Sequence, residues 1–161
     1  MLHLSSEDVD AVLDVDAVLD ALETVYDDYA RGDAAFTQRA DIITPVPPSS
    51  AEDADLVPPV VHGFKTMSGA VRSMEATALR LNSDIIHWPT VEGARRRVKV
   101  PAAPGGQYTA FIQVFDTRTG RLLSIMPDGE IQRLCVGGTN ALAADVLARP
   151  DATEVALLGA G

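Results

Sequence analysis

Few residues in this sequence have the types and spacing to do chemistry, and the most suggestive group is the glycine turn at its end. Leu157 and Leu158 close a buried-strand pattern and are followed by Gly159, Ala160 and Gly161. A strand and a Gly-x-Gly turn begin a dinucleotide-binding unit, because glycines let backbone amides approach a pyrophosphate. The complete fingerprint also needs a third small residue, a helix and a later acid. We therefore take Gly159 and Gly161 as cofactor-binding candidates.

The single cysteine and the histidines form no recognisable catalytic or metal-binding motif. Cys135 has no second cysteine for a disulfide, and no histidine stands in a partner motif for a cysteine nucleophile. His3, His62 and His87 lack metal-ligand spacing. We expect no catalytic residue of this kind and no metal, and we interpret Cys135 as a small buried apolar residue.

The charge balance narrows the range of partners. Thirteen Lys and Arg residues against 23 Asp and Glu residues give a net charge of -10. An acidic chain repels phosphate backbones and anionic lipid surfaces, so we expect neither a nucleic acid nor a membrane as a partner. The N-terminus has no basic segment before an apolar run, and we expect a cytoplasmic protein.

The first half of the chain predicts two helices and several strands. Ser5 and Ser6 before two acids predict the start of a short helix. Apolar residues at helical spacing over 15–29 predict a second helix that ends at Gly32. Residues 38–46 suit a strand and precede a loop rich in proline and acids. Short apolar segments follow at 60–67 and 76–86.

The second half predicts a hairpin, a helix and a last strand. Residues 108–126 contain two strand patterns around DTRTG and predict a β-hairpin. The glycines at 137 and 138 predict a helix start, with Pro150 as its stop. Residues 154–158 resemble a buried strand, and Arg95–Arg97 suit solvated charges beside a turn. We expect an α+β fold with helices packed on a mixed or antiparallel sheet.

Four segments follow one another as in the ornithine cyclodeaminase and mu-crystallin family, which this chain resembles over nearly its whole length. They are LSSEDVDAVLDVDAVLDALETVYDDYARG, FDTRTGRLLSIM, IQRLCVGGTNALAADVLARPDA and VALLGAG. The resemblance implies NAD(P)-dependent enzymes with a dimerising substrate domain and a Rossmann domain. It assigns residues 1–150 to the substrate-binding and dimerisation domain. Residues 151–161 would be the first strand and glycine turn of an incomplete dinucleotide-binding domain.

The resemblance also implies a chemistry and places to look for it. In the family, the cofactor exchanges a hydride with the α-carbon of an amino or imino acid. Positively charged side chains hold the carboxylate of that acid. Arg39 resembles the arginine on the family's early strand, and both Arg80 and Lys99 fit the position of a family lysine. These three are the substrate-binding candidates, with Lys65 as a further alternative. Each could equally form an ordinary salt bridge.

The chain departs from the family pattern where a substrate-binding arginine is expected. The family's L-R-[TV]-G-A motif is replaced here by the residues from Leu134 to Gly138, with Cys135 at the arginine position. A thiol has no positive charge and is only a weak donor. No residue matches the family's catalytic aspartate, and we interpret Asp116 and Asp128 as turn-capping residues.

We therefore expect the substrate-binding and dimerisation portion of such an enzyme, truncated or split and inactive alone. NAD(P) is the family's cofactor, and we expect this chain by itself not to bind it. The expected partners are a small amino or imino acid and a second copy of the chain, with a separate Rossmann-domain chain as a further candidate. The alternative is a stand-alone ligand-binding or dimerisation module without catalysis, and an interrupted gene is a third explanation.

Overall fold

The structure, a computed structural model, describes residues 1–47, 55–102 and 108–158. Within them eight strands form a mixed sheet in the order β1-β10-β9-β5-β4-β2, with β3 also paired to β4 and β8 to β5. Every pair is antiparallel except β1 with β10. The strands are β1 (Leu2–His3), β2 (Ala34–Phe36), β3 (Ala40–Pro45), β4 (Val61–Val71), β5 (Ala76–His87), β8 (Val98–Val100), β9 (Thr109–Asp116) and β10 (Leu122–Pro127).

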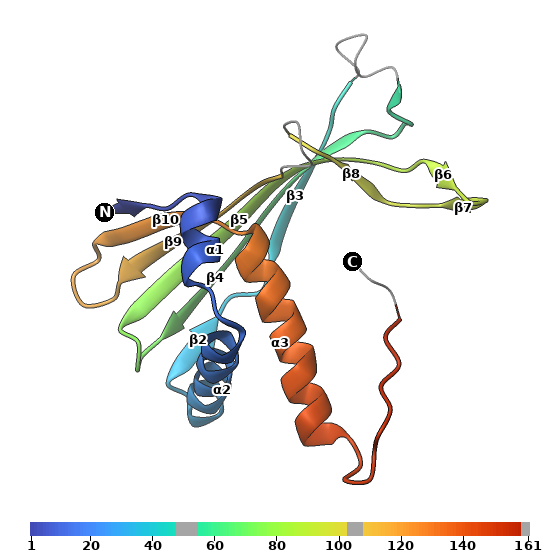
Figure 1. The fold of residues 1–161 in the computed structure, drawn as a ribbon. Coiled ribbons are helices and arrows are strands. Elements are labelled where there is room, and N and C mark those ends of the chain that lie inside the picture. Colours follow the sequence, from blue (N-terminus) through green and yellow to red (C-terminus); the bar gives the residue numbers. More distant parts are fainter. Residues whose placement is uncertain (48–54, 103–107, 159–161) are drawn as a thin grey trace.

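The helices α1 (Ser6–Val12), α2 (Val15–Arg31) and α3 (Gly129–Leu147) lie on one side of this sheet (Figure 1). This arrangement confirms the predicted α+β fold. The predicted hairpin is β9 with β10, and a small separate hairpin is formed by β6 (Thr90–Val91) and β7 (Ala94–Arg95). None of the described helices has the length and apolar character needed to cross a membrane.

Helix α1 begins, and helix α2 ends, where the sequence predicts. The Ser5 hydroxyl accepts a hydrogen bond from the Asp8 amide, and the Asp8 carboxylate accepts one from the Ser5 amide, which completes a capping box. Gly32 ends α2 with φ at +81°, a left-handed conformation that suits glycine. Local sequence therefore decides both helices.

The third helix begins earlier than the two glycines suggest. Helix α3 starts at Gly129 and continues through Gly137 and Gly138, which were predicted to lie at its start. Gly138 has a packing role instead, because a Cβ there would lie 2.8 Å from Leu22 Cδ1 of α2. The prediction of this boundary was wrong because a glycine that permits close contact between two helices gives the same sequence signal as a glycine at a helix terminus.

The predicted last strand is not formed. Residues 152–158 lie outside any helix or strand, and Val155, Leu157 and Leu158 are 88%, 82% and 98% exposed. A strand needs a hydrogen-bonded neighbour, and no described strand pairs with this segment. Gly159 and Gly161 lie outside the described residues.

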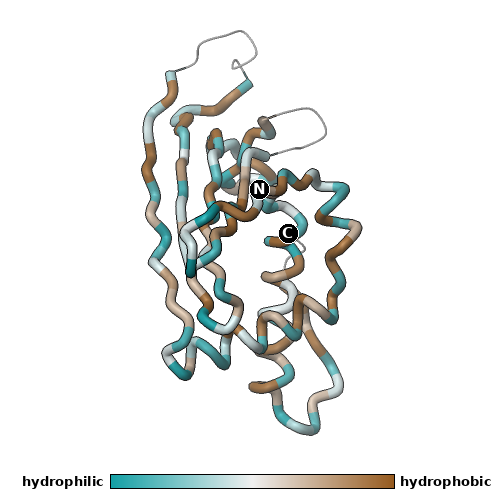
Figure 2. The backbone as a smooth tube through the Cα atoms, turned by 90° about the vertical axis from the view of Figure 1, so that its left-hand side faces the viewer, coloured by the Kyte–Doolittle hydropathy of each residue, from teal (hydrophilic) through white to brown (hydrophobic). Residues whose placement is uncertain are grey.

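The two faces of the sheet differ in polarity. Along the long strands, hydrophilic and hydrophobic residues alternate (Figure 2). On the central strand β5, Asn82 and Asp84 are buried on the helix side, whereas Leu79 and Leu81 on the opposite side are half-buried. The helix side of β5 therefore carries buried polar residues, whereas the opposite side carries two leucines together with Ser83, which is hydrogen-bonded to His62.

Candidate functional site

Three polar residues follow one another on the helix side of the central strand. Arg80, Asn82 and Asp84 alternate along β5, which is paired with β4 on one side and with β9 on the other. Asn82 is 6% exposed and Asp84 only 2%. Burying polar and charged groups in the middle of a sheet costs free energy unless they are paired, so each member needs a partner.

Asp84 lies between the chain's two lysines. Lys65 Nζ on β4 donates a hydrogen bond to Asp84 Oδ2 over 2.9 Å, and Lys99 Nζ on β8 lies 3.0 Å from the same oxygen. Burial alone would raise the pKa of Asp84, but the two ammonium groups hold that pKa below its usual value. Asp84 is therefore ionised at neutral pH.

This Lys65–Asp84–Lys99 group, the lysine triplet, has a surplus of positive charge, because two ammonium groups share one carboxylate. The surplus stands out in a chain with a net charge of -10. The Lys65 side chain is 12% exposed and that of Lys99 33%, so Lys99 is the more accessible ammonium. An anion approaching the triplet would be attracted to Lys99 first.

Arg80 is neutralised by the start of α3. Its Nε donates to Asp128 Oδ2 over 2.7 Å, and Nη2 donates to Gln132 Oε1 over 2.5 Å. Asp128 makes no capping hydrogen bond and its side chain is 1% exposed. The interpretation of Asp128 as a turn-capping residue was therefore wrong, and its carboxylate instead joins α3 to the central strand.

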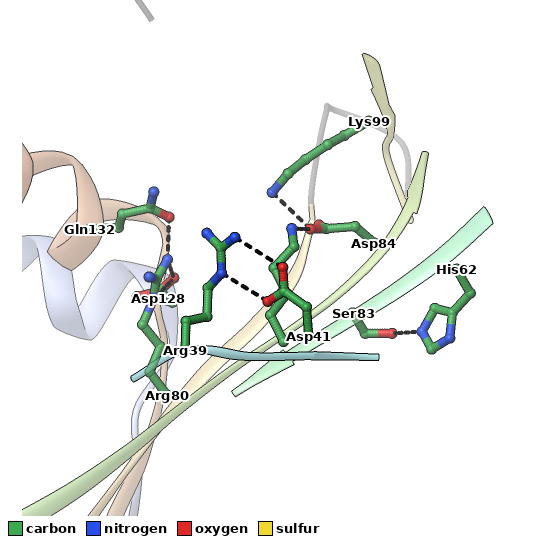
Figure 3. A network of polar contacts seen from close by, with 10 residues as sticks. Arg39, Asp41, His62, Arg80, Ser83, Asp84, Lys99, Asp128 and Gln132 are labelled. Carbon is green, nitrogen blue, oxygen red and sulfur yellow. Dashed lines mark hydrogen bonds and ion pairs between the residues drawn. The ribbon is translucent and has the colours of Figure 1, made fainter. Parts of the chain in front are cut away.

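Arg39 also has a carboxylate partner. Its Nε lies 2.8 Å from Asp41 Oδ1, and its Nη2 donates to Asp41 Oδ2 over 2.9 Å, so the pair is bidentate. The Arg39 side chain is 57% exposed, and Asp41 follows it on β3. Figure 3 shows these charged groups gathered on one region of the sheet, with the His62–Ser83 hydrogen bond farther along. Each predicted cation thus forms an ion pair.

Two neighbouring cavities divide these residues. A cavity of about 710 Å³ is lined by Lys99 together with Asn82, Tyr108 and Gln132. A second cavity, of about 280 Å³, is lined by Arg39 and Lys65, among others. The structure therefore separates the four cations. Lys99 lines the larger cavity, and Arg39 and Lys65 line the smaller one. Arg80 lines neither cavity, but its partners Asp128 and Gln132 line the larger one.

Sequence reasoning missed two residues of this region. Arg97 is exposed as predicted, yet it borders both cavities, and it makes no ion pair within the part of the chain that the structure describes. Asn82 lines the larger cavity between two charged residues of β5. The polar residues at every second position from Arg80 to Asp84 were the signal available in the sequence.

Cys135 lies close enough to Asp128 and Arg80 for their charges to act on its thiol, and it has no positive charge of its own. Burial and the negative charge of Asp128 raise the pKa of its thiol, and the nearby Arg80 has a weaker opposite effect. Cys135 follows Gln132 by three residues, which places both on one face of α3. At neutral pH this position therefore holds an uncharged thiol.

No protein-family model matches the sequence, and the search of curated proteins found no match. Solved structures do match. The chain is similar to a probable ornithine cyclodeaminase from Bordetella pertussis Tohama I, with 19% identity, a TM-score of 0.62 and coverage of 93% of this chain and 37% of that one. An archaeal alanine dehydrogenase dimer with bound NAD matches with 19% identity, a TM-score of 0.64 and coverage of 94% and 38%.

A third similar structure is the Thermococcus litoralis Δ1-pyrroline-2-carboxylate reductase in complex with NADH and L-proline. It shares 22% identity with a TM-score of 0.64, covering 94% of this chain and 39% of that one. At these identities the likeness shows the fold. The chain spans less than two fifths of the length of each of these three proteins.

Proposed function

We propose that this chain is the substrate-binding and dimerisation portion of an NAD(P)-dependent enzyme that acts on a small amino or imino acid. The observation that carries the proposal is the lysine triplet, whose surplus positive charge borders a cavity of about 710 Å³. Ligand cavities of this size hold small molecules. The fold shared with a reductase in complex with L-proline supports the same substrate class.

The proposal gives the predicted cations different roles. Lys99 binds the substrate carboxylate, because it belongs to the triplet and lines the larger cavity. Arg80 is a positioning residue that holds α3 against β5 through Asp128. Arg39 borders the smaller cavity and forms an exposed pair with Asp41.

In this proposal NAD(P) supplies hydride transfer when it is bound by the dinucleotide-binding domain. The described residues contain no glycine-rich turn that leads into a phosphate-binding helix, and Gly159 and Gly161 lie outside them. The residues from β1 to α3 therefore bind and orient the substrate. A stand-alone binding module is the second candidate function, since the same cavity would hold an amino acid without any reaction.

Calorimetric titration tests the proposed site. L-Proline, L-alanine, L-ornithine and Δ1-pyrroline-2-carboxylate are titrated into the wild-type chain and into Lys99→Met, which keeps the length of the side chain and removes its charge. We expect at least one acid to bind, with an affinity about tenfold weaker in Lys99→Met. Arg31→Met, which changes an exposed pair on α2, is the control. Absence of binding to all four acids would contradict the proposal.

We also propose that the chain forms a homodimer through the sheet face that carries no helix. Apolar side chains gather there, and Ile42 and Phe111 are 62% and 39% exposed. Leu81 lies directly opposite Phe111 in the register of β5 and β9, so these two apolar side chains are neighbours on this face. Contiguous exposed apolar surface is typical of protein interfaces. The archaeal alanine dehydrogenase that shares this fold is a dimer.

A further inference from the structure

Asn82 occupies the middle of the polar row on β5. Its side chain lies on the helix side of the sheet, between those of Arg80 and Asp84. It is 6% exposed and it lines the larger cavity together with Lys99. The residue therefore combines burial within the protein with access to the space in which Lys99 would hold a carboxylate.

Asn82 differs from its two neighbours in the partners of its side chain. Arg80 is bonded to Asp128 and Gln132, and Asp84 is paired with both lysines through Oδ2, whereas Asp84 Oδ1 is buried without a hydrogen-bond partner among the described residues. The Asn82 amide makes no hydrogen bond to any residue in the described ranges, although it offers two N–H donors and a carbonyl acceptor. The Asn82 amide atoms are not among the fully buried polar atoms that lack a partner, so the amide is open to the cavity that the residue lines. Its position points to a partner inside the cavity.

We propose that Asn82 is the specificity-determining residue of this site, and that its Oδ1 accepts a hydrogen bond from the N–H of an amino or imino acid. The inference rests on the proposed function, because Lys99 must hold the carboxylate of the same molecule. An uncharged acceptor suits this position, since Lys65 stands opposite Asn82 in the sheet register and both lysines already share Asp84. Lys99 thus recognises the acid, and Asn82 recognises its nitrogen.

The proposal predicts discrimination between acids that differ at one atom. Cyclopentanecarboxylate has the ring and carboxylate of L-proline, with a methylene group in place of the ring nitrogen. Tetrahydrofuran-2-carboxylate has an ether oxygen there, which accepts hydrogen bonds but cannot donate one. We expect the wild-type chain to bind L-proline about tenfold more tightly than either analogue.

Calorimetric titration of wild type, Asn82→Leu and Asn82→Ala with these three acids tests the proposal. Leucine replaces the amide with an apolar group of similar size, and alanine avoids any steric conflict if leucine impairs folding, which circular dichroism reports. Both substitutions should weaken L-proline binding about tenfold and leave the binding of cyclopentanecarboxylate unchanged.

The outcomes separate this inference from the proposed function. If the wild type binds L-proline and cyclopentanecarboxylate equally, and neither substitution changes this, the role of Asn82 is overturned while that of Lys99 stands. If the wild type binds neither these three acids nor L-alanine, L-ornithine or Δ1-pyrroline-2-carboxylate, the proposed function fails and the role of Asn82 fails with it. If the Asn82 substitutions weaken all three acids equally, the residue supports the shape of the site and does not recognise nitrogen.

Discussion

Lys65 Nζ lies 2.9 Å from Asp84 Oδ2, across two neighbouring strands of the sheet. The Asp84 side chain is fully buried and that of Lys65 is 12% exposed, so water screens their attraction only weakly. Lys99 approaches the same carboxylate oxygen. One buried carboxylate therefore keeps two ammonium groups close together, and this arrangement leads to the first two predictions.

Replacing Asp84 by Asn should destabilise the fold, because it leaves two ammonium groups near each other without a counter-charge. We expect the free energy of unfolding to fall by about 3 kcal/mol, measured by urea denaturation. Asp41→Asn is the matched control, because it removes the partner of the exposed Arg39 and should cost less than about 1 kcal/mol. Equal losses of unfolding free energy in the two variants would show that burial of the lysine triplet adds nothing to the stability of the fold.

The contribution of Asp84 should depend on pH in a defined direction. The lysines hold its pKa in the folded state below the usual value. The carboxylate therefore stabilises the fold fully above its unfolded-state pKa of about 4, and this stabilisation is lost as the pH falls through the lower folded-state pKa. The difference in unfolding free energy between wild type and Asp84→Asn should be constant near neutral pH and should narrow below about pH 4. A difference that widens on acidification would refute the assignment.

The two adjacent glycines of α3 should respond differently to substitution. A Cβ at Gly137 would meet nothing within 4 Å, so Gly137→Ala should stabilise the chain by about 0.5–1 kcal/mol through helix propensity. A Cβ at Gly138 would press on Leu22 and Leu19, so Gly138→Val should cost about 1–3 kcal/mol. Thermal denaturation of both variants measures the contrast, which would be absent if α2 and α3 were not in close contact.

Cys135→Arg should strengthen carboxylate binding. The substitution places a cation at the position where the family that this chain resembles has an arginine. Position 135 lies on the same face of α3 as Gln132, which lines the larger cavity. A new charge-assisted hydrogen bond predicts roughly tenfold tighter binding of L-proline in calorimetry. Cys135→Ser keeps the size and adds no charge, and it should bind as the wild type does. Equal affinities of the Arg and Ser variants would show that position 135 does not face the ligand.

A charge on the uncovered sheet face should prevent the proposed dimer. Ile42→Glu places a carboxylate at a position on this face that is 62% exposed, and it should convert the dimer to a monomer in analytical ultracentrifugation. Val12→Glu on α1 is the control, because Val12 is 75% exposed on the opposite side of the sheet and its substitution should leave the dimer intact. A wild-type chain that sediments as a monomer at all concentrations would exclude the interface.

The sequence by itself determined the elements whose signals are local. The Ser5 capping box, the glycine at the end of α2 and the loop between β9 and β10 each act within a few residues, so α1, α2 and the hairpin follow directly from them. The start of α3 could not be found in this way, because Gly138 leaves room for a leucine side chain of α2 and does not mark a helix end. The segment at 154–158 has a strand pattern, but a pattern cannot supply the neighbour to which a strand must pair.

The tertiary structure alone decided which charges meet. The sequence and its family resemblance identified Arg39, Arg80, Lys65 and Lys99 as candidates, but left open whether each binds a ligand or a carboxylate of the chain. Lys65 meets a carboxylate 19 residues away and Arg80 meets one 48 residues away, on elements brought together by strand pairing and helix packing. Electrostatic interactions depend on distance in space and on burial, and both quantities exist only once the sheet is assembled.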